Sequence, residues 1–434
     1  MKMKKNIINK DKKYLWHPFT QIQGSNDPII IENAKGEKLY DIDGNVYLDL
    51  ISSWWINTHG HCRKEIIESV FNQSKKLEQV LFAGFTHQPA VDLAEKLVNF
   101  LPKSLSRVFY SDNGSTAVEI AMKVAVQYWY NKGKKKNKFV AFRGGYHGDT
   151  FGAMSVGQTS GFYEPFREML NPVDFINFPE EWKGNNELKK NENEALLQIS
   201  KLLKKEKNEI AAVIIEPLIQ GAGGMRICRK EFLSKFVKTC KESGIIVIFD
   251  EVMTGFGRTG KMFACNHLDI YPDIICLAKS LTGGFIPLAT TIFDENIHKE
   301  FVDANFEKTF LHGHTFSANP VACSAALSSL ELFQKDNTFE KIKKISDIHQ
   351  NYLDELSTKK NISKVRMLGT IAAFDYNGIS SKYGSEESRS LKNTFMKHGL
   401  LLRPLGNTIY LMPPFCISPQ NLVNSYEKLI EILQ

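Results

Sequence analysis

Three short apolar runs, each followed by a charged residue, constrain the fold of this chain more than any other feature. The runs and the residues that follow them are 210–215 with Glu216, 245–249 with Asp250, and 274–278 with Lys279. All three are unbroken and rich in β-branched residues, which is typical of strands buried on both faces of a parallel sheet. Helical patterns and turns separate them. The sequence therefore predicts an α/β fold.

The three charged residues fall where open α/β sheets bind ligands, outside the carboxyl ends of the strands. A lysine in that place is costly to bury unless it is neutralised or paired. A partly desolvated amine has a pKa below its usual value of about 10.4 and can condense with an aldehyde. A single lysine at a strand end more often extends to solvent. Together with Glu216 and Asp250, Lys279 is consistent with one reactive site.

The segment 111–116 follows an apolar run and precedes a helical pattern over 117–130. We expect Thr116 and Glu119 to form a capping box at the start of this helix. A strand, a glycine turn and a helix start offer free backbone N–H groups to a phosphate. A capped helix without a ligand explains the pattern equally well.

The segment 255–260 fits G-x-G-x-x-G, the pattern of dinucleotide-binding turns. Residues 250–254 separate it from the preceding strand, and no clear helix follows. A dinucleotide-dependent oxidoreductase is therefore disfavoured.

Several other polar and aromatic residues are candidates for a site. Trp54 and Trp55 are adjacent, so from a strand they cannot both point into a core, and one is free to line a pocket. His147 and Asp149 form either an acid–base pair or structural hydrogen bonds. Arg403 ends an apolar run, which suits either carboxylate binding or an internal salt bridge.

Composition excludes several classes of function. The net charge of +7 is small for 434 residues, and the lysines are scattered, so no nucleic-acid surface is indicated. No apolar run approaches the roughly 20 residues that span a bilayer, and the basic N-terminus lacks a signal-peptide core. The seven cysteines have no metal-ligand spacing, so we expect no metal, and their scatter suggests reduced thiols in the cytoplasm.

The remaining patterns suggest two domains. Asp43-Gly44 predicts a hairpin within an antiparallel meander over 29–50. Further patterns predict helices at 181–208, 230–243 and 321–357, and strands at 370–375 and 408–412. We expect a large domain over 57–324, and a small α+β domain made of 1–56 and 325–434.

Taken together, these residues resemble a known family over about residues 14 to 415. Asp250, Lys279, the Gly114-Ser115 turn and the segments 145–148 and 312–315 resemble the class III, fold-type I pyridoxal-phosphate aminotransferases. More narrowly, some motifs resemble the branch that makes 7,8-diaminononanoate from 8-amino-7-oxononanoate in biotin biosynthesis. These motifs are WHPFT (16–20), SSWW (52–55), and the segments 145–155, 216–226 and 410–414.

The resemblance implies a large domain with a mostly parallel sheet flanked by helices, which binds pyridoxal 5'-phosphate. Lys279 would bind the cofactor covalently and later move the substrate proton. Asp250 would keep the pyridine nitrogen protonated, and Tyr146 would stack on the ring. Gly114 and Ser115 would hold the phosphate.

The resemblance also implies a homodimer whose active site is shared between subunits, because Thr315 would reach the phosphate in the partner subunit's site. The residues implied in substrate binding are Phe19, Trp54, Trp55, Gly313 and Arg403. Two positions depart from the family pattern: Phe19 stands where many members have tyrosine, and His314 where many have proline.

The implied reaction is a ping-pong aldimine transamination with S-adenosylmethionine as the usual donor, although some relatives use lysine. An ω-amino acid transaminase or an aminomutase is the nearest alternative. A non-catalytic cofactor-binding protein is a further one, which the intact Lys279 and Asp250 disfavour.

Overall fold

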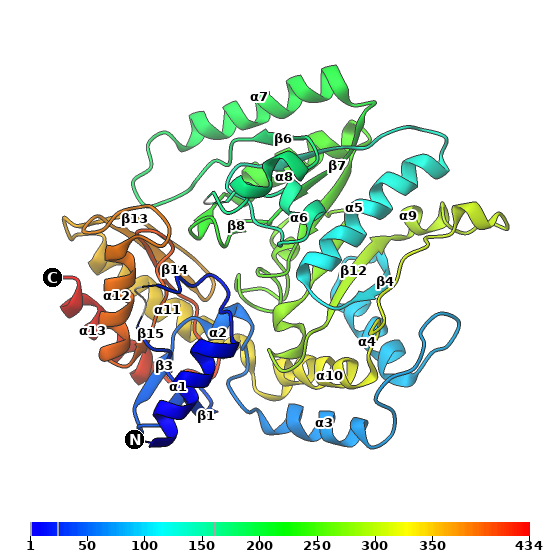
Figure 1. The fold of residues 1–434 in the computed structure, drawn as a ribbon. Coiled ribbons are helices and arrows are strands. Elements are labelled where there is room, and N and C mark those ends of the chain that lie inside the picture. The colour runs from blue at the N-terminus through cyan, green and yellow to red at the C-terminus, as the bar shows by residue number, and fades with distance from the viewer. Residues whose placement is uncertain (1, 24–25, 160) are drawn as a thin grey trace.

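The computed structural model describes residues 2–23, 26–159 and 161–434. Residues 1, 24 and 25 of the predicted N-terminal segment lie outside this described part, as does residue 160. A seven-stranded sheet forms the centre of the larger part of the molecule (Figure 1). Its strands, in spatial order, are β4 (Leu105–Ser111), β12 (Ala289–Asp294), β11 (Ile274–Leu277), β10 (Ile246–Asp250), β7 (Ile210–Ile215), β5 (Lys138–Phe142) and β6 (Val173–Ile176).

The sheet is mostly parallel. Strand β12 pairs antiparallel with both of its neighbours, whereas the pairs from β11 to β6 are all parallel. The three apolar runs of the sequence are β7, β10 and β11, and nearly every residue in them is fully buried. The predicted α/β class and its buried central strands are confirmed.

Successive residues of the central strands face opposite hydrophobic clusters, because side chains alternate along a strand. Val213 and Val247 pack with the inner face of one set of helices, while Ala212 and Ile248 pack with α5 (Gly114–Asn131). The first set includes α4 (Gln88–Phe100), α7 (Leu188–Glu206) and α8 (Lys230–Glu242), of which the last confirms the helix expected at 230–243. Both faces are therefore covered, which explains why these strands lack the polar alternation of half-exposed ones.

Other helices of the larger part connect and cover its edges. They are α3 (Lys64–Ser74), α6 (Phe151–Ser155), α9 (Glu295–Lys299) and α10 (Pro320–Lys335), with 3₁₀ turns at Glu164–Met169, Ala264–His267, Lys279–Thr282 and Phe306–Lys308. Helix α2 (Ser52–Trp55) belongs to the N-terminal segment of the smaller part. A small ribbon joins β8 (Ile219–Gln220) to β9 (Arg226–Ile227).

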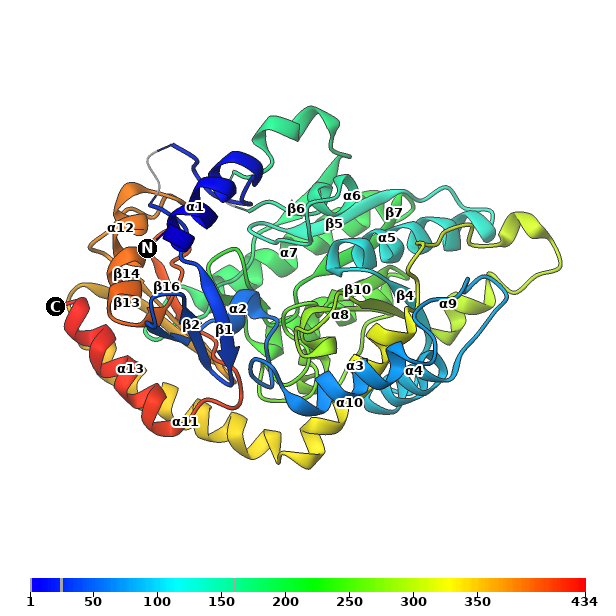
Figure 2. The same cartoon turned by 60° about the horizontal axis from the view of Figure 1, so that its bottom comes forward.

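The smaller part combines the two ends of the chain. One sheet has the order β1 (Ile31–Lys35), β2 (Lys38–Asp41), β3 (Val46–Asp49) and β15 (Leu400–Leu401), and another has β13 (Ile362–Leu368), β14 (Ile371–Tyr376) and β16 (Thr408–Leu411). The helices here are α1 (Lys2–Tyr14), α11 (Thr338–Leu356), α12 (Glu386–Lys397) and α13 (Pro419–Ile432). Figure 2 shows α11 and α13 packed side by side along its edge.

The parallel pairing of β3 with β15 joins the first fifty residues to the last forty. This pairing supports the proposal that 1–56 and 325–434 form one small domain beside the large domain 57–324. The hairpin predicted at Asp43-Gly44 is confirmed, with Gly44 at a φ of 83° between β2 and β3.

Two sequence expectations are wrong in detail. The helix at Gly114–Asn131 is capped by Asn113, whose side chain accepts from the Thr116 N–H, rather than by Thr116 with Glu119. The helical pattern over 321–357 is two helices, α10 and α11, because Asn337 adopts a left-handed conformation between them. Within the described ranges, no helix is both long and apolar enough to cross a membrane.

Candidate active site

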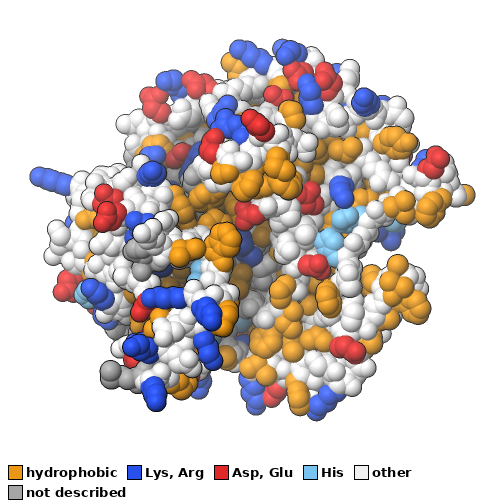
Figure 3. Space-filling model, viewed as in Figure 1, with side chains coloured by type: hydrophobic (Ala, Val, Ile, Leu, Met, Phe, Trp, Pro, Cys, Tyr) orange, Lys and Arg blue, Asp and Glu red, His pale blue; other side chains and the backbone are white. Residues whose placement is uncertain are grey.

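A cavity of about 610 Å³ lies at the carboxyl ends of the parallel strands. In the space-filling view, hydrophobic side chains surround the hollow between the two parts of the molecule (Figure 3). Because β12 runs the opposite way, the segment that leads into it, 286–288, reaches the same edge. Six predicted site residues line the cavity: Trp55, Gly114, Ser115, Tyr146, Asp250 and Lys279.

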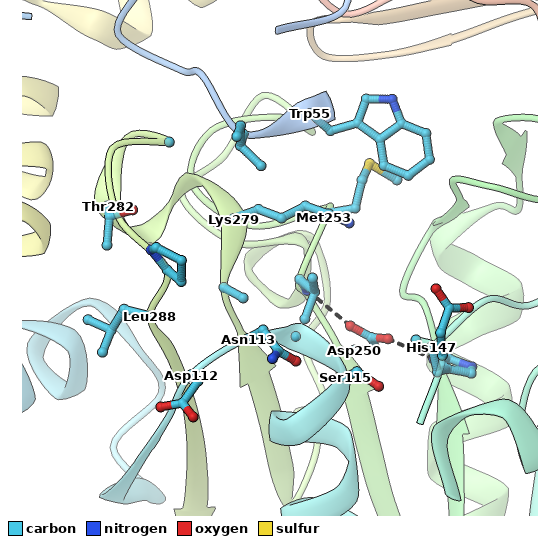
Figure 4. A pocket seen from close by; sticks show the side chains of 18 of the residues that line it. Trp55, Asp112, Asn113, Ser115, His147, Asp250, Met253, Lys279, Thr282 and Leu288 are labelled. Carbon is cyan, nitrogen blue, oxygen red and sulfur yellow. Dashed lines mark hydrogen bonds and ion pairs between the residues drawn. The ribbon is translucent and has the colours of Figure 1, made fainter. Parts of the chain in front are cut away.

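Lys279 follows β11 and has a φ of 46°, an uncommon conformation for a residue other than glycine. Its Nζ lies 4.9 Å from the centre of the Trp55 ring, and Figure 4 shows the side chain extending below that ring. Burial lowers the pKa of Lys279, and the negative charges of Asp250 and Glu216 oppose this shift only in part. The amine is therefore easier to deprotonate than an exposed lysine.

Asp250 ends β10 and is oriented by two hydrogen bonds (Figure 4). The Val252 N–H donates to Oδ1 at 3.1 Å, and His147 Nδ1 lies 2.7 Å from Oδ2. Burial disfavours a charged His147, but the hydrogen bond and charge of Asp250 outweigh it and raise the pKa of His147. Asp250 is 4% exposed, so its carboxylate is held with a fixed partner at the cavity wall.

The pair of His147 with Asp149 that the sequence allowed does not form. Asp149 instead accepts a hydrogen bond of 2.9 Å from the Tyr146 hydroxyl. Burial contributes most to raising the pKa of Tyr146, and the negative charge of Asp149 raises it further. The phenol of Tyr146 therefore stays protonated.

Glu216 also lines the cavity, so the three charged residues that follow the apolar runs do lie at one site, as expected. The Glu216 carboxylate accepts from the backbone N–H groups of Tyr146 and Gly221, each at 2.9 Å. Burial raises the pKa of Glu216 to about 7, and the charge of Asp250 adds to the effect while His147 opposes it. Glu216 thus links the loop that carries Tyr146 to the turn between β8 and β9.

The start of α5 provides a cradle for an anion. Asn113 caps the helix, and the backbone of Gly114 packs so closely on Val252 that a Cβ atom would lie 2.6 Å from a Val252 methyl group. Ser115 Oγ lies 2.7 Å from Thr150 Oγ1 and accepts from the Thr150 N–H at 3.1 Å. Free N–H groups at a helix start attract phosphate.

Gly148 allows the loop of Tyr146 and His147 to lie against this cradle. Its φ is +126°, and a Cβ atom there would lie 2.4 Å from the Ser115 Cβ. The residue can only be glycine without displacing one of the two segments. The aromatic loop and the helix start are therefore built as one unit.

The two tryptophans have different surroundings. They do not lie on a strand, because residues 52–55 form the short helix α2, with irregular backbone angles at Ser53 and Trp54. Trp55 is buried, lines the cavity and donates from Nε1 to the Tyr410 hydroxyl at 2.9 Å. Trp54 is 42% exposed and faces Phe19 and Arg403. The buried tryptophan is thus the cavity wall.

Phe19, Trp54 and Arg403 lie together outside the cavity lining. The guanidinium carbon of Arg403 is 4.6 Å from the Trp54 ring centre and 6.0 Å from that of Phe19. Among the described residues Arg403 forms no salt bridge, so the internal ion pair that the sequence allowed is absent.

Gly313 and Thr315 are not part of this cavity. The Thr315 carbonyl accepts from Gln79 Nε2 at 3.0 Å, and no atom would crowd a Cβ at Gly313. Between them, His314 Nδ1 lies 3.2 Å from Asp112 Oδ2, and Asp112 does line the cavity. The predicted substrate-binding role of Gly313 and the predicted role of Thr315 in the partner subunit's site stay predictions.

No cluster of His, Cys, Asp and Glu side chains with metal-binding geometry occurs in the part of the chain that the structure describes. The donor set instead suits an organic group with a phosphate at one end. The start of α5 fits the phosphate, Asp250 fits a protonated ring nitrogen, and Lys279 fits an aldehyde.

Comparisons with known proteins agree with this chemistry. A family model described as "Aminotransferase class-III" matches residues 20–433. An adenosylmethionine-8-amino-7-oxononanoate aminotransferase from Synechococcus elongatus is 44% identical over 97% of this chain and 98% of its own. The Staphylococcus aureus protein of the same name is 39% identical over 96% of this chain and 95% of its own.

Solved structures agree as well. The crystal structure of adenosylmethionine-8-amino-7-oxononanoate aminotransferase from Methanocaldococcus jannaschii has a TM-score of 0.90 and 37% identity, covering 99% of each chain. An ω-transaminase from Pseudomonas jessenii in complex with PMP has a TM-score of 0.91 and 27% identity, covering 98% of each chain.

Proposed function

Since the chain belongs to the class III aminotransferases, we propose that it transfers an amino group to 8-amino-7-oxononanoate and so forms 7,8-diaminononanoate for biotin biosynthesis. The predicted family and enzyme class are confirmed by the match over residues 20–433. The identity of the acceptor rests on the names of relatives that cover nearly all of both chains.

The observation that carries the proposal is the placement of Lys279 and Asp250 on one cavity beside the α5 cradle. The proposed cofactor is pyridoxal 5'-phosphate, with Gly114 and Ser115 at its phosphate, Asp250 at its ring nitrogen and Tyr146 on its ring face. When bound, this cofactor supplies an electron sink for the substrate carbon that loses its proton.

The protein residues then position the reactants and move protons. Burial lowers the pKa of Lys279, so its Nζ is suited to act as the base that moves a proton between carbon atoms during the transfer. Asp250 holds its charge in place through Val252 and His147, so it needs no rearrangement during the reaction. Trp55 excludes water from one side of Lys279.

The proposed substrate path is lined by Trp54, Trp55, Phe19 and Arg403. The indole rings suit an acyl chain, and the unpaired guanidinium of Arg403 suits its carboxylate. We propose S-adenosylmethionine as the amine donor, with lysine as the alternative that the sequence leaves open.

The proposed assembly is a homodimer in which Gly313 and the partner subunit's Thr315 complete each site. Thr315 does not line the cavity of its own subunit, which supports this proposal. The seven cysteines are all free, which supports the proposed cytoplasmic location.

A direct test incubates the purified enzyme, loaded with pyridoxal phosphate, with 8-amino-7-oxononanoate and either S-adenosylmethionine or lysine. Mass spectrometry should show 7,8-diaminononanoate with one donor and none with a Lys279→Ala variant. If the wild type forms no product with either donor but transfers amino groups to pyruvate or succinic semialdehyde, it is an ω-amino acid transaminase instead.

A further inference from the structure

Four aromatic rings form a collar around Arg403 at the end of the proposed substrate path. The Phe19 ring lies 5.6 Å from Trp54 and 5.5 Å from Phe162, and Phe162 lies 4.8 Å from Tyr383, all edge to face. These contacts bring together residues 19, 54, 162 and 383, which are far apart in the sequence. No sequence pattern pointed to Phe162 or Tyr383.

The collar fixes the plane of the guanidinium. Arg403 stacks on Trp54 at 4.6 Å, and its Nη2 donates a hydrogen bond of 2.7 Å to the Tyr383 hydroxyl. A guanidinium carries several in-plane N–H donors, so one hydrogen bond to a phenol leaves most of its edge available. No carboxylate of the described chain occupies that edge.

Positive charge at the collar is not balanced from within the protein. Lys392, on α12, forms no ion pair among the described residues, and burial and the charge of Arg403 lower its pKa. An anion bound at Arg403 would therefore also be attracted by the charge of Lys392.

The Tyr383 hydroxyl has an unused donor. Its oxygen accepts from Arg403, but its own O–H has no acceptor within the described ranges. A phenol can accept and donate at the same time. A carboxylate lying against the free edge of Arg403 would be within reach of this O–H, so it would receive N–H and O–H donors together.

We propose that Tyr383 is a substrate-binding residue, which donates a hydrogen bond to the carboxylate held by Arg403 while Phe162 fixes its ring. Tyr383 thereby determines specificity for chains that end in a free carboxylate. The role of Tyr383 in catalysis rests on the proposed function. Its preference for a ligand with a free carboxylate does not depend on which oxo acid is the natural acceptor.

The test compares nonanoate with methyl nonanoate, in which an O-methyl group removes the negative charge of the carboxylate. Binding of each to the cofactor-loaded enzyme is measured by tryptophan fluorescence, because Trp54 touches Arg403. The variants are Tyr383→Phe, which keeps the ring on Phe162, and Tyr352→Phe as the control. Tyr352 lies on α11 and stacks on Tyr426, away from the collar.

We expect Tyr383→Phe to weaken nonanoate binding by roughly two- to tenfold, the usual effect of one hydrogen bond, and to leave methyl nonanoate binding unchanged. The control should match the wild type for both ligands. With 8-amino-7-oxononanoate, the KM should rise by a similar factor while kcat changes little.

Equal nonanoate affinity in Tyr383→Phe and the wild type would overturn the inference, as would an equal loss for the acid and the ester. If the carboxylate preference is lost in Tyr383→Phe but the enzyme does not use 8-amino-7-oxononanoate, the inference stands and the proposed acceptor is wrong.

Discussion

At the scale of single residues, the site is governed by how each charged group is paired inside the protein. Lys279 has an aromatic ring and no hydrogen-bonded carboxylate in contact with its Nζ, whereas Asp250 has a histidine at 2.7 Å. The Lys279 amine is thus left free to react, whereas the Asp250 carboxylate is held in place. The same contrast separates Arg403, which forms no ion pair among the described residues, from surface arginines such as Arg107 and Arg167 that form salt bridges.

The buried Glu216 should make stability depend on pH. Its folded-state pKa of about 7 exceeds the ordinary value of 4.5, so the native state takes up a proton first as the pH falls. The cost of its charge is complete above pH 7 and disappears as the pH falls toward 4.5. Relative to the wild type, Glu216→Gln should therefore be favoured by roughly 1 to 3 kcal/mol more at pH 8 than at pH 5, because glutamine carries no charge.

Urea unfolding of both proteins at pH 8 and pH 5, with saturating cofactor, measures this difference. The advantage of the variant should shrink at pH 5. A difference that is the same at both pH values would mean that Glu216 is already neutral, or is compensated by its two backbone N–H donors.

Arg403→Ala should raise the KM for 8-amino-7-oxononanoate by about thirty- to a hundredfold, because a hydrogen-bonded charge pair with the substrate is lost. The rate at which the amine donor reacts with the cofactor should change little. Stopped-flow absorbance separates the two half-reactions. Arg389→Ala, an exposed arginine on α12, serves as the control, and equal damage to both half-reactions would mark Arg403 as structural.

At the scale of elements, the site depends on close backbone packing between the start of α5 and the segment after β10. Gly114→Ala should weaken cofactor binding about tenfold, because the new methyl group would lie 2.6 Å from Val252. Alanine otherwise favours a helix by up to about 1 kcal/mol, so the loss must come from this contact.

The double variant Gly114→Ala/Val252→Ala tests that explanation, since it removes the methyl groups that collide. Cofactor affinity, measured by fluorescence titration, should recover toward the value of Val252→Ala alone. No recovery would show that the backbone of residue 114 needs freedom rather than space.

The elements were predictable to the extent that their signals are local. The apolar, β-branched composition of β7, β10 and β11 predicts that these strands are buried. The two residues Asp43 and Gly44 are enough to predict the hairpin turn. The break at Asn337 was missed because asparagine is tolerated within helical patterns, and the cap at Asn113 was missed because Thr116 with Glu119 fits the same motif. Glu119 instead accepts from Thr150 at 2.6 Å, a contact that no local pattern shows.

The site was predictable where chemistry dictates the residue type, as for Lys279 and Asp250. It was not predictable where the partner comes from a distant segment. His147 meets Asp250 across about a hundred residues, and Tyr383 meets Arg403 only because the small part of the molecule brings α12 next to β15. Neither tyrosine nor histidine carries a sequence signal for such a partner.

At the scale of the whole molecule, the cavity lies at the carboxyl ends of the large sheet, where Trp55 of the N-terminal segment joins its lining. Trp55 and Tyr410 come from the part formed by the two ends of the chain, so their hydrogen bond closes one side of the site. The separate position of Thr315 leads to the proposed dimer, in which each site takes this residue from the other subunit.

Mixing two inactive variants tests the shared site. In a hybrid of Lys279→Ala and Thr315→Asp subunits, one of the two sites keeps both native residues if Thr315 acts in the partner's site. Activity should then reappear after joint unfolding and refolding, up to about a quarter of the wild-type value, because half of random dimers are hybrids with one intact site. If Thr315 acts in its own subunit, no mixture regains activity.

The central claim is that Lys279 holds an aldehyde cofactor and passes amino groups through it. The most direct measurement is the visible absorption spectrum of the purified protein, before and after S-adenosylmethionine is added, and again after 8-amino-7-oxononanoate. We expect a yellow protein that is bleached by S-adenosylmethionine and recovers its colour with 8-amino-7-oxononanoate. If lysine is the donor, lysine should bleach the protein instead. A protein that stays colourless after reconstitution with pyridoxal phosphate, or whose colour survives Lys279→Ala unchanged, would contradict the central claim.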